Sequence, residues 1–295
     1  MASSCKRLAV IGAAGQFGSD IVDVFRATGR YELSAFRHED LEITDPSAVE
    51  KAILGGGFGA VVNCAAFHQV DACQDDPEKA FGVNAVGALQ VARACRKIDA
   101  LCVFISTDYV FGGSSPSPYD ETAVPAPVNV YGASKLAAET LVAQAAGRWL
   151  TLRVASLFGR AGAQGKGGNF IDKIIAKARS GGPVKVVTDI RMSPTYTRDA
   201  AELLDGLIQA GATGIIHGAN AGQCSWFDLA KEAVRLAGLN VPVEPITSDA
   251  FASKARRPRN SALVSRRIEP ILGRRPRPWQ EALRAYMGEK GYVTT

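Results

Sequence analysis

Three side chains with complementary proton chemistry lie near the middle of the chain: Thr107, Tyr131 and Lys135. Tyr131 and Lys135 are four residues apart, so on a helix they share one face. An ammonium group close to a phenol favours the tyrosinate and lowers the phenol pKa, which suits a tyrosine to give or take a proton. Thr107 and the preceding Ser106 end an apolar run, ALCVFIS, that is typical of a strand. Parallel sheets bind ligands at the carboxyl ends of their strands, so we expect a site there.

A second chemical signal is the glycine run Gly12-Ala-Ala-Gly15-Gln-Phe-Gly18, which follows the apolar run RLAVIG. Glycines at a strand-to-helix turn let backbone amides approach a pyrophosphate at the helix N-terminus. The spacing is GxxGxxG rather than GxGxxG, and the weight of the signal comes from its place in the first strand–helix unit. The run predicts nucleotide binding.

The elements that must position these residues alternate along the first half of the chain. Apolar runs typical of buried strands are separated by amphipathic stretches, which predict helices over residues 16–27, from residue 46, and over 77–97 and 130–145. The five runs are RLAVIG, YELSAF, AVVNCA, ALCVFIS and WLTLRVA. This order predicts an α/β fold of the Rossmann type, with a doubly wound parallel sheet covered on both faces.

Beyond residue 155 the alternation loosens, and no long linker interrupts the chain. We expect a dinucleotide-binding domain made of residues 1–155 together with about 184–217. Residues of about 156–183 and 218–295 are expected to form a smaller, C-terminal substrate-binding region.

Composition excludes several classes of protein. The 295 residues are 47% hydrophobic and 21% charged, as in ordinary globular chains. No apolar run reaches the roughly 18 residues that span a bilayer. The six cysteines show no CxxC spacing and form no cluster with the three histidines, so we expect no metal site and a reduced, cytoplasmic protein.

The net charge of +5 is local, because nine basic residues and one acid lie between Lys254 and Arg277. Such a cluster could bind a phosphate-bearing ligand, grip a nucleic acid or be solvated. No basic stripe interleaved with aromatic residues appears, so we expect no nucleic-acid partner and no membrane partner.

Taken together, the motifs resemble the extended short-chain dehydrogenases/reductases, and within them the dTDP-4-dehydrorhamnose reductase family. The similarity extends over nearly the whole chain. It is carried by GAAGQFG, LEITD, VVNCAAFHQVDACQDDP, FGVNAVGAL, ISTDYVFGG, YDETAVPAPVNVYGASKLAAE, LRVASLFG, DIRMSPTYTRDAA and ARRPRNSAL.

The resemblance implies an NAD(P)H-dependent ketoreductase acting on a nucleotide-linked sugar, with dTDP-4-dehydro-L-rhamnose as the first expectation. It implies that Thr107 hydrogen-bonds the substrate carbonyl, that Tyr131 donates the proton, and that Lys135 holds the nicotinamide ribose and tunes Tyr131. A reductase or epimerase for another nucleotide sugar, or a non-catalytic NADP-binding regulatory subunit of this fold, are the alternatives. The presence of all three residues argues against the regulatory subunit. Monomer and homodimer both stay open.

The same resemblance assigns the remaining binding residues. Gly12, Gly15, Gln16, Phe17 and Gly18 match the pyrophosphate loop, Glu42 and Ile43 the adenine contacts, and Cys64, Ala65 and Ala66 the segment beneath the cofactor. Asn169, Arg256, Arg257 and Asn260 match positions around the sugar nucleotide, and His68 could line that pocket. An arginine suits the substrate diphosphate, because its guanidinium binds phosphate through two parallel hydrogen bonds.

Two departures from the family concern the sugar pocket. Ser156 stands where family members commonly have tryptophan, an aromatic residue beside the sugar. Arg191 and Met192 replace residues that are usually smaller or less polar. We therefore expect the fold and reaction type of the family, with the sugar itself left open.

The second strand bears on the choice of cofactor. NAD-selective sheets place an acid at the end of this strand, where it binds the ribose 2′-OH. Here the strand ends in Phe36-Arg37-His38, and the first acids, Glu39 and Asp40, come later. Arg37 could pair with a 2′-phosphate or point to solvent. We predict NADPH as the preferred cofactor, with NADH as the alternative.

Overall fold

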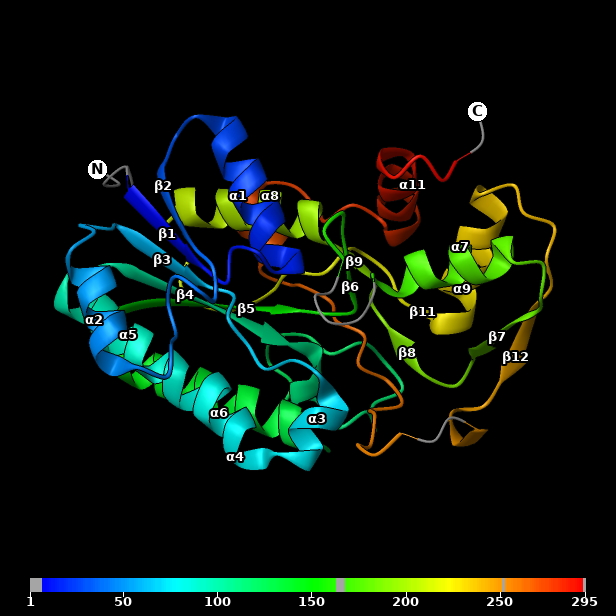
Figure 1. Cartoon of the computed structure of the whole chain (residues 1–295), viewed down its shortest axis with the longest axis horizontal. Coiled ribbons are helices and arrows are strands. Elements are labelled where there is room, and N and C mark those ends of the chain that lie inside the picture. The colour runs from blue at the N-terminus through cyan, green and yellow to red at the C-terminus, as the bar shows by residue number, and fades with distance from the viewer. Residues whose placement is uncertain (1–6, 163–167, 251–252, 294–295) are drawn as a thin grey trace.

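The centre of the fold is a six-stranded parallel sheet in the order β10-β5-β4-β3-β1-β2 (Figure 1). This computed structural model describes residues 7–162, 168–250 and 253–293, so Cys5 lies outside the described residues. The sheet strands are β1 (Arg7–Ile11), β2 (Glu32–Phe36), β3 (Ala60–Asn63), β4 (Leu101–Thr107), β5 (Arg148–Val154) and β10 (Gly214–His217). The predicted doubly wound Rossmann-type fold is confirmed.

Helices cover both faces of the sheet because its strands are apolar on both sides. In β1, Leu8 and Val10 face the core beneath α1 (Gln16–Thr28) and α8 (Thr197–Gln209), which lie side by side in Figure 1. The alternate residues, Ala9 and Ile11, face the opposite core. That core is covered by α2 (Pro46–Leu54), α5 (Ala88–Lys97) and α6 (Val130–Ala145).

The strand order changes direction between β1 and β3. From β1 the chain first adds β2 on one side, and then β3, β4, β5 and β10 in turn on the other. Loops leaving β1 and β3 at their carboxyl ends therefore diverge and open a crevice, which is where sheets of this kind bind ligands. The glycine turn follows β1, and Thr107 ends β4, which lies on the far side of β3 from β1.

The smaller region lies beside the carboxyl edge of the sheet (Figure 1). Its helices are α7 (Phe170–Arg179), α9 (Trp226–Leu236), α10 (Ile268–Leu272) and α11 (Trp279–Glu289). Its short strands are β6 (Leu157–Phe158), β7 (Val184–Val187), β8 (Arg191–Met192), β9 (Thr195–Tyr196), β11 (Cys224–Ser225) and β12 (Val243–Ile246). Among the helices of the smaller region, α10 packs against α8 of the larger domain through Ile268.

The structure corrects the expected boundary at residue 184. β7 pairs with β12 and packs against α7 and α9, so residues 184–187 belong to the smaller region and not to the dinucleotide-binding domain. By contrast, α8 and β10 pack on and within the central sheet, where the prediction placed them. The sequence analysis named no helix near the C-terminal end of the chain, where the structure has α11. Its Leu283 and Tyr286 are buried in the hydrophobic core of the smaller region.

The helix expected over residues 77–97 is interrupted. It consists of α4 (Pro77–Phe81), the π-helical segment η1 (Gly82–Gly87) and α5. A Cβ on Gly87 would lie 2.8 Å from the Ile43 side chain, so η1 passes close to the loop after β2. A further short helix, α3 (Val70–Asp75), occupies a stretch where none was predicted.

No helix among the described residues is both long and apolar enough to cross a bilayer. No group of three or more His, Cys, Asp or Glu among them could hold a metal ion.

Candidate active site

The structure brings Thr107, Tyr131 and Lys135 together between the end of β4 and the first turns of α6. Asn129 starts α6 by accepting a hydrogen bond from the Gly132 amide over 2.8 Å, which fixes Tyr131 in the first turn. Lys135 follows one turn later, with its ammonium 4.1 Å from the centre of the Phe104 ring in β4. The helix thus presents both side chains to the strand that ends in Thr107.

The pKa of the Tyr131 phenol is raised, whereas the sequence analysis expected it to be lowered. Burial raises the pKa of Tyr131, and Asp108 adds to the rise, while a hydrogen bond with Thr107 lowers it in part. The expected lowering by Lys135 is wrong for this structure, since its ammonium lies over Phe104. A phenol with a raised pKa stays protonated at neutral pH, which suits a proton donor.

Lys135 is 2% exposed, and desolvation lowers its pKa to about 8, against the opposing charge of Glu139. Cys64 directly follows β3. Burial raises the pKa of its thiol to about 12, and the nearby charge of Lys135 offsets part of that rise. The ammonium of Lys135 therefore lies near Cys64, the first residue of the segment that the resemblance places beneath the cofactor.

This pKa yields a pH prediction. The Lys135 ammonium is charged below about pH 8 and neutral above it, so a contribution to cofactor binding should be lost as the pH rises. Between about pH 7 and about pH 9.5 the dissociation constant for NADPH should rise, approaching tenfold per pH unit at the alkaline end. Fluorescence titrations at several pH values would measure it, with Lys135→Met as the control that loses the dependence. A pH-independent affinity in the wild-type protein would contradict this role.

Asn84, in the middle of η1, ties the loop after β3 to the catalytic helix. Its amide group donates to the Phe67 carbonyl over 3.0 Å and to the Ser134 hydroxyl over 2.9 Å, and its oxygen accepts from the Phe67 amide over 2.8 Å. Ser134 lies between Tyr131 and Lys135 on α6 and donates to the Tyr131 carbonyl. The π-helical segment therefore positions both the helix and the loop that carries His68.

A fully buried ion pair lies behind the catalytic residues. Arg153 and Glu139 are 2% and 4% exposed, and the guanidinium binds the carboxylate through two hydrogen bonds of 2.9 and 2.6 Å. The Ser106 hydroxyl donates to the same carboxylate over 2.5 Å. Because Ser106 precedes Thr107 and Glu139 lies one turn after Lys135, the pair fixes the end of β4 against α6.

His217 completes this network as a neutral side chain. Its Nδ1 lies 3.2 Å from the Tyr119 carbonyl and 3.1 Å from the Val264 carbonyl, and since carbonyls only accept, Nδ1 carries the proton. Burial lowers the pKa of His217 to about 4. His217 therefore has a structural role, linking β10 to the Tyr119 and Val264 carbonyls.

Asp108 follows Thr107 and is 3% exposed. Burial raises its pKa to about 6, although hydrogen bonds with Ser261 and Thr107 lower it in part. Its Oδ2 is buried without a hydrogen-bond partner among the described residues. One acceptor therefore remains unused beside the Thr107 hydroxyl.

The glycine turn after β1 fits a pyrophosphate. Gly12 has a φ of +76°, and a Cβ there would lie 2.9 Å from the Ala65 amide nitrogen. A Cβ on Gly18 would lie 2.2 Å from the Gly12 carbonyl oxygen. Side chains are thus excluded at both positions, and Gly15 begins α1, whose first turn carries no acid. These features suit a phosphate at the helix N-terminus.

The residues expected around the adenosine lie at the end of β2. The Arg37 guanidinium is 2.9 Å from Glu39 and 3.2 Å from Asp40, so it is already paired with two carboxylates. Ile43 is buried against the sheet, and Glu42 accepts a hydrogen bond from the Thr44 amide over 3.0 Å. A 2′-phosphate would have to draw Arg37 from these acids.

Two of the expected substrate residues have structural roles instead. Asn169 is 4% exposed and caps α7, and its amide group donates to the Gly159 carbonyl and the Tyr286 hydroxyl. Asn260 is 6% exposed, donates to the Ser115 and Ser117 carbonyls and accepts from the Ala262 amide. Because every polar group of both side chains is used inside the protein, the structure does not support direct contacts with substrate.

The other expected substrate residues are His68, Ser156, Arg256 and Arg257. His68 is half-buried between β3 and α3, and Ser156 is half-buried after β5 with a left-handed φ of +43°. Arg256 is exposed, whereas Arg257 is bound to Asp71 of α3. Asp71 was not singled out from the sequence.

A family model described as the RmlD substrate binding domain matches residues 6–291 of the chain. The chain belongs to this family. The resemblance found in the sequence is confirmed, and with it an enzyme of the reductase class.

Relatives of the chain carry reductase names. The dTDP-4-dehydrorhamnose reductase of Mycobacterium tuberculosis H37Rv is 38% identical over 290 residues, which cover 96% of this chain and 93% of that protein. The dTDP-4-keto-6-deoxy-D-glucose reductase of Streptomyces niveus is 38% identical over 259 residues, 87% of this chain and 88% of that protein. A crystal structure of the Bacillus anthracis dTDP-4-dehydrorhamnose reductase with NADP superposes with a TM-score of 0.91 at 32% identity, covering 97% of this chain and 99% of that chain.

Proposed function

We propose that this family member reduces the 4-keto group of a nucleotide-linked deoxysugar with NADPH, and that dTDP-4-dehydro-L-rhamnose is its substrate. The observation that carries the proposal is the meeting of Thr107, a protonated Tyr131 and Lys135 beside a glycine turn that fits a pyrophosphate. The names of the relatives supply the substrate class. Bound NADPH supplies the hydride.

The chain's own residues would handle the carbonyl oxygen. The Thr107 hydroxyl orients the keto group, and the Tyr131 phenol gives its proton to the oxygen as the hydride reaches the carbon, so that a hydroxyl forms. The phenol then regains a proton from solvent. The Lys135 ammonium, which lies near Cys64, orients the cofactor ribose.

A second substrate within the same class is favoured by the sugar pocket. Ser156 takes the place of the usual tryptophan and holds a left-handed backbone conformation. A relative named for dTDP-4-keto-6-deoxy-D-glucose matches 87% of the chain. The second candidate is thus reduction of another dTDP-linked 4-keto sugar.

A cofactor-oxidation assay on a panel of 4-keto sugar nucleotides tests both candidates. The panel should contain dTDP-4-dehydro-L-rhamnose, dTDP-4-keto-6-deoxy-D-glucose and a UDP-linked 4-keto sugar. The highest kcat/KM is expected for dTDP-4-dehydro-L-rhamnose. Oxidation with none of them, in protein that binds NADPH, would support the non-catalytic alternative.

The cofactor preference follows from Arg37. We predict that kcat/KM for NADPH exceeds that for NADH by about tenfold and that Arg37→Asp erases or reverses the preference. Since Glu39 and Asp40 compete for the guanidinium, Glu39→Gln with Asp40→Asn should raise the preference for NADPH. Steady-state kinetics with both cofactors measure the three ratios. A wild-type enzyme that favours NADH would contradict the prediction.

A further inference from the structure

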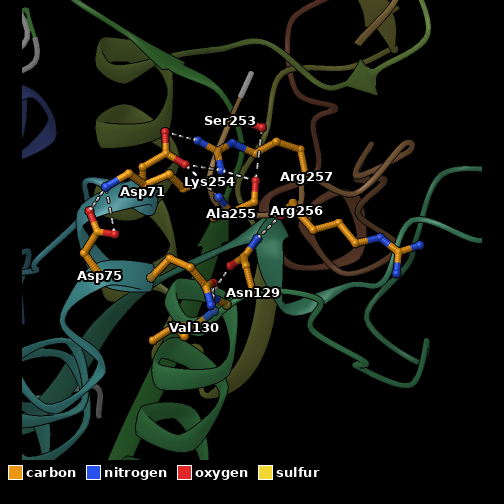
Figure 2. A network of polar contacts seen from close by, with 11 residues as sticks. Asp71, Asp75, Asn129, Val130, Ser253, Lys254, Ala255, Arg256 and Arg257 are labelled. Carbon is orange, nitrogen blue, oxygen red and sulfur yellow. Dashed lines mark hydrogen bonds and ion pairs between the residues drawn. The ribbon is translucent and has the colours of Figure 1, made fainter. Parts of the chain in front are cut away.

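The segment of residues 254–257, here called the clasp segment, is fastened to α3 and to the start of α6 (Figure 2). Asp71 accepts hydrogen bonds from both terminal nitrogens of Arg257, each over 3.1 Å, and from the Ala255 amide over 3.0 Å. The same guanidinium donates to the Ala255 carbonyl over 2.8 Å. One carboxylate therefore fixes both the backbone and a side chain of the clasp segment.

The next residue of the clasp segment is held by the catalytic helix. The Asn129 amide group donates to the Arg256 carbonyl over 2.8 Å, while its oxygen caps α6 at Gly132. Asn129 is two residues from Tyr131, so the backbone of Arg256 is held beside the first turn of α6. Its position relative to the proton donor is thus fixed through a single side chain.

The side chain of Arg256 behaves differently from its neighbours. It is exposed and points away from Asp71 and Arg257 in Figure 2. Among the residues that the structure describes, its guanidinium makes no ion pair, whereas Lys254 is paired with Asp75 over 2.8 Å and Arg257 with Asp71 over 3.1 Å. A cation left unpaired on an immobilised backbone is preorganised for an external anion.

We propose that Asp71 is a positioning residue for substrate binding: by holding Arg257 and Ala255, it places the free guanidinium of Arg256 against the diphosphate of the nucleotide sugar. This inference rests on the proposed function for the identity of the anion. It assigns different roles to the two neighbouring arginines. Arg256 contacts the ligand, whereas Arg257 binds Asp71 and helps to hold the clasp segment in place.

The chain contains a matched control for this role. Asp75 lies on the same helix as Asp71 and also pairs with the clasp segment, but its partner Lys254 is 69% exposed. Within the described part of the chain, no backbone amide donates to the Asp75 carboxylate. Exposed pairs of this kind contribute little to stability. Loss of Asp75 should therefore leave the place of Arg256 unchanged.

The test is calorimetric binding of dTDP to the NADP⁺-saturated protein, which requires no turnover. Asp71→Asn should raise the dissociation constant of dTDP by about tenfold, and Asp75→Asn should leave it within about twofold. Arg256→Ala should also raise it. In the Arg256→Ala background, Asp71→Asn should have no further effect, because the residue through which it acts is gone. The Kd of NADPH should be unchanged in all variants, which shows that they are folded.

Several results would overturn the inference. An unchanged dTDP affinity in Asp71→Asn would do so, as would an effect of Asp71→Asn that persists in full in the Arg256→Ala background. If dTDP does not bind the wild-type protein, UDP, CDP and GDP are tried in turn, and binding of none of them refutes a diphosphate site at Arg256. Failure of the proposed reaction is a separate outcome, since a protein that binds dTDP through Arg256 but reduces no keto sugar keeps this inference and loses that function.

Discussion

Replacement of Tyr131 by phenylalanine should lower kcat by about 10²–10⁴-fold, the usual contribution of a general acid. The variant removes one oxygen atom and leaves the ring, which packs edge-on against Tyr109 with 6.0 Å between ring centres. Since burial keeps the wild-type phenol protonated, the lost group is the proton donor itself. Single-turnover reduction of the keto sugar, followed by NADPH oxidation, measures the effect on the chemical step.

The control for this variant is cofactor binding. Tyr131→Phe keeps Lys135, the glycine turn and the cap at Asn129, so the Kd of NADPH and the thermal midpoint should stay near the wild-type values. Tyr109→Phe, which removes the neighbouring hydroxyl, should retain most of the activity. Near-normal turnover in Tyr131→Phe would remove this residue from the mechanism.

Replacement of Arg153 by methionine should lower the free energy of unfolding by roughly 3–5 kcal/mol, because it leaves the Glu139 carboxylate buried without its partner. Both side chains are almost fully buried, at 2% and 4% exposure, so solvent cannot compensate the remaining charge. The Ser106 hydroxyl alone would still donate to it. Urea unfolding followed by circular dichroism measures the loss.

The double variant Arg153→Met/Glu139→Leu provides the control for the buried pair. Removing both charges together should recover most of the lost stability, since apolar replacements of buried pairs are often neutral or stabilising. Recovered stability with reduced kcat would show that the pair also fixes the end of β4 against α6. An Arg153→Met protein as stable as the wild type would contradict the account of this network.

The central sheet and the placing of Tyr131 and Lys135 on one helix were predictable from the sequence because their signals are local. Apolar runs such as those of β3 and β4 form buried strands wherever they pair, and the spacing of Tyr131 and Lys135 fixes one helix face. The π-helical segment η1 and the pairing of β7 with β12 were missed because they depend on distant partners, Ile43 for Gly87 and the 243–246 strand for β7.

The errors at the site have the same origin. The pKa of Tyr131 is set by burial and by Asp108, which the four-residue spacing to Lys135 does not reveal. Asn169 matched a substrate position by motif, yet its side chain donates to the Gly159 carbonyl and to the hydroxyl of Tyr286, which lies 117 residues further along the chain. Asp71 could not be singled out from the sequence because its role depends on a hydrogen bond from Arg257, which lies 186 residues away in the chain.

The central claim is that this protein moves hydride from NADPH to the keto carbon of a nucleotide-linked sugar while Tyr131 supplies the proton. The most direct test is a reaction of dTDP-4-dehydro-L-rhamnose with NADPH that carries deuterium at both hydrogen positions of C4 of its nicotinamide ring, followed by mass spectrometry and NMR of the sugar product. The account predicts one deuterium on the carbon that held the keto group in the wild-type product, and a strongly reduced rate of labelling in Tyr131→Phe. A reduced sugar without deuterium at that carbon, or NADPH oxidation without reduction of the sugar, would contradict it.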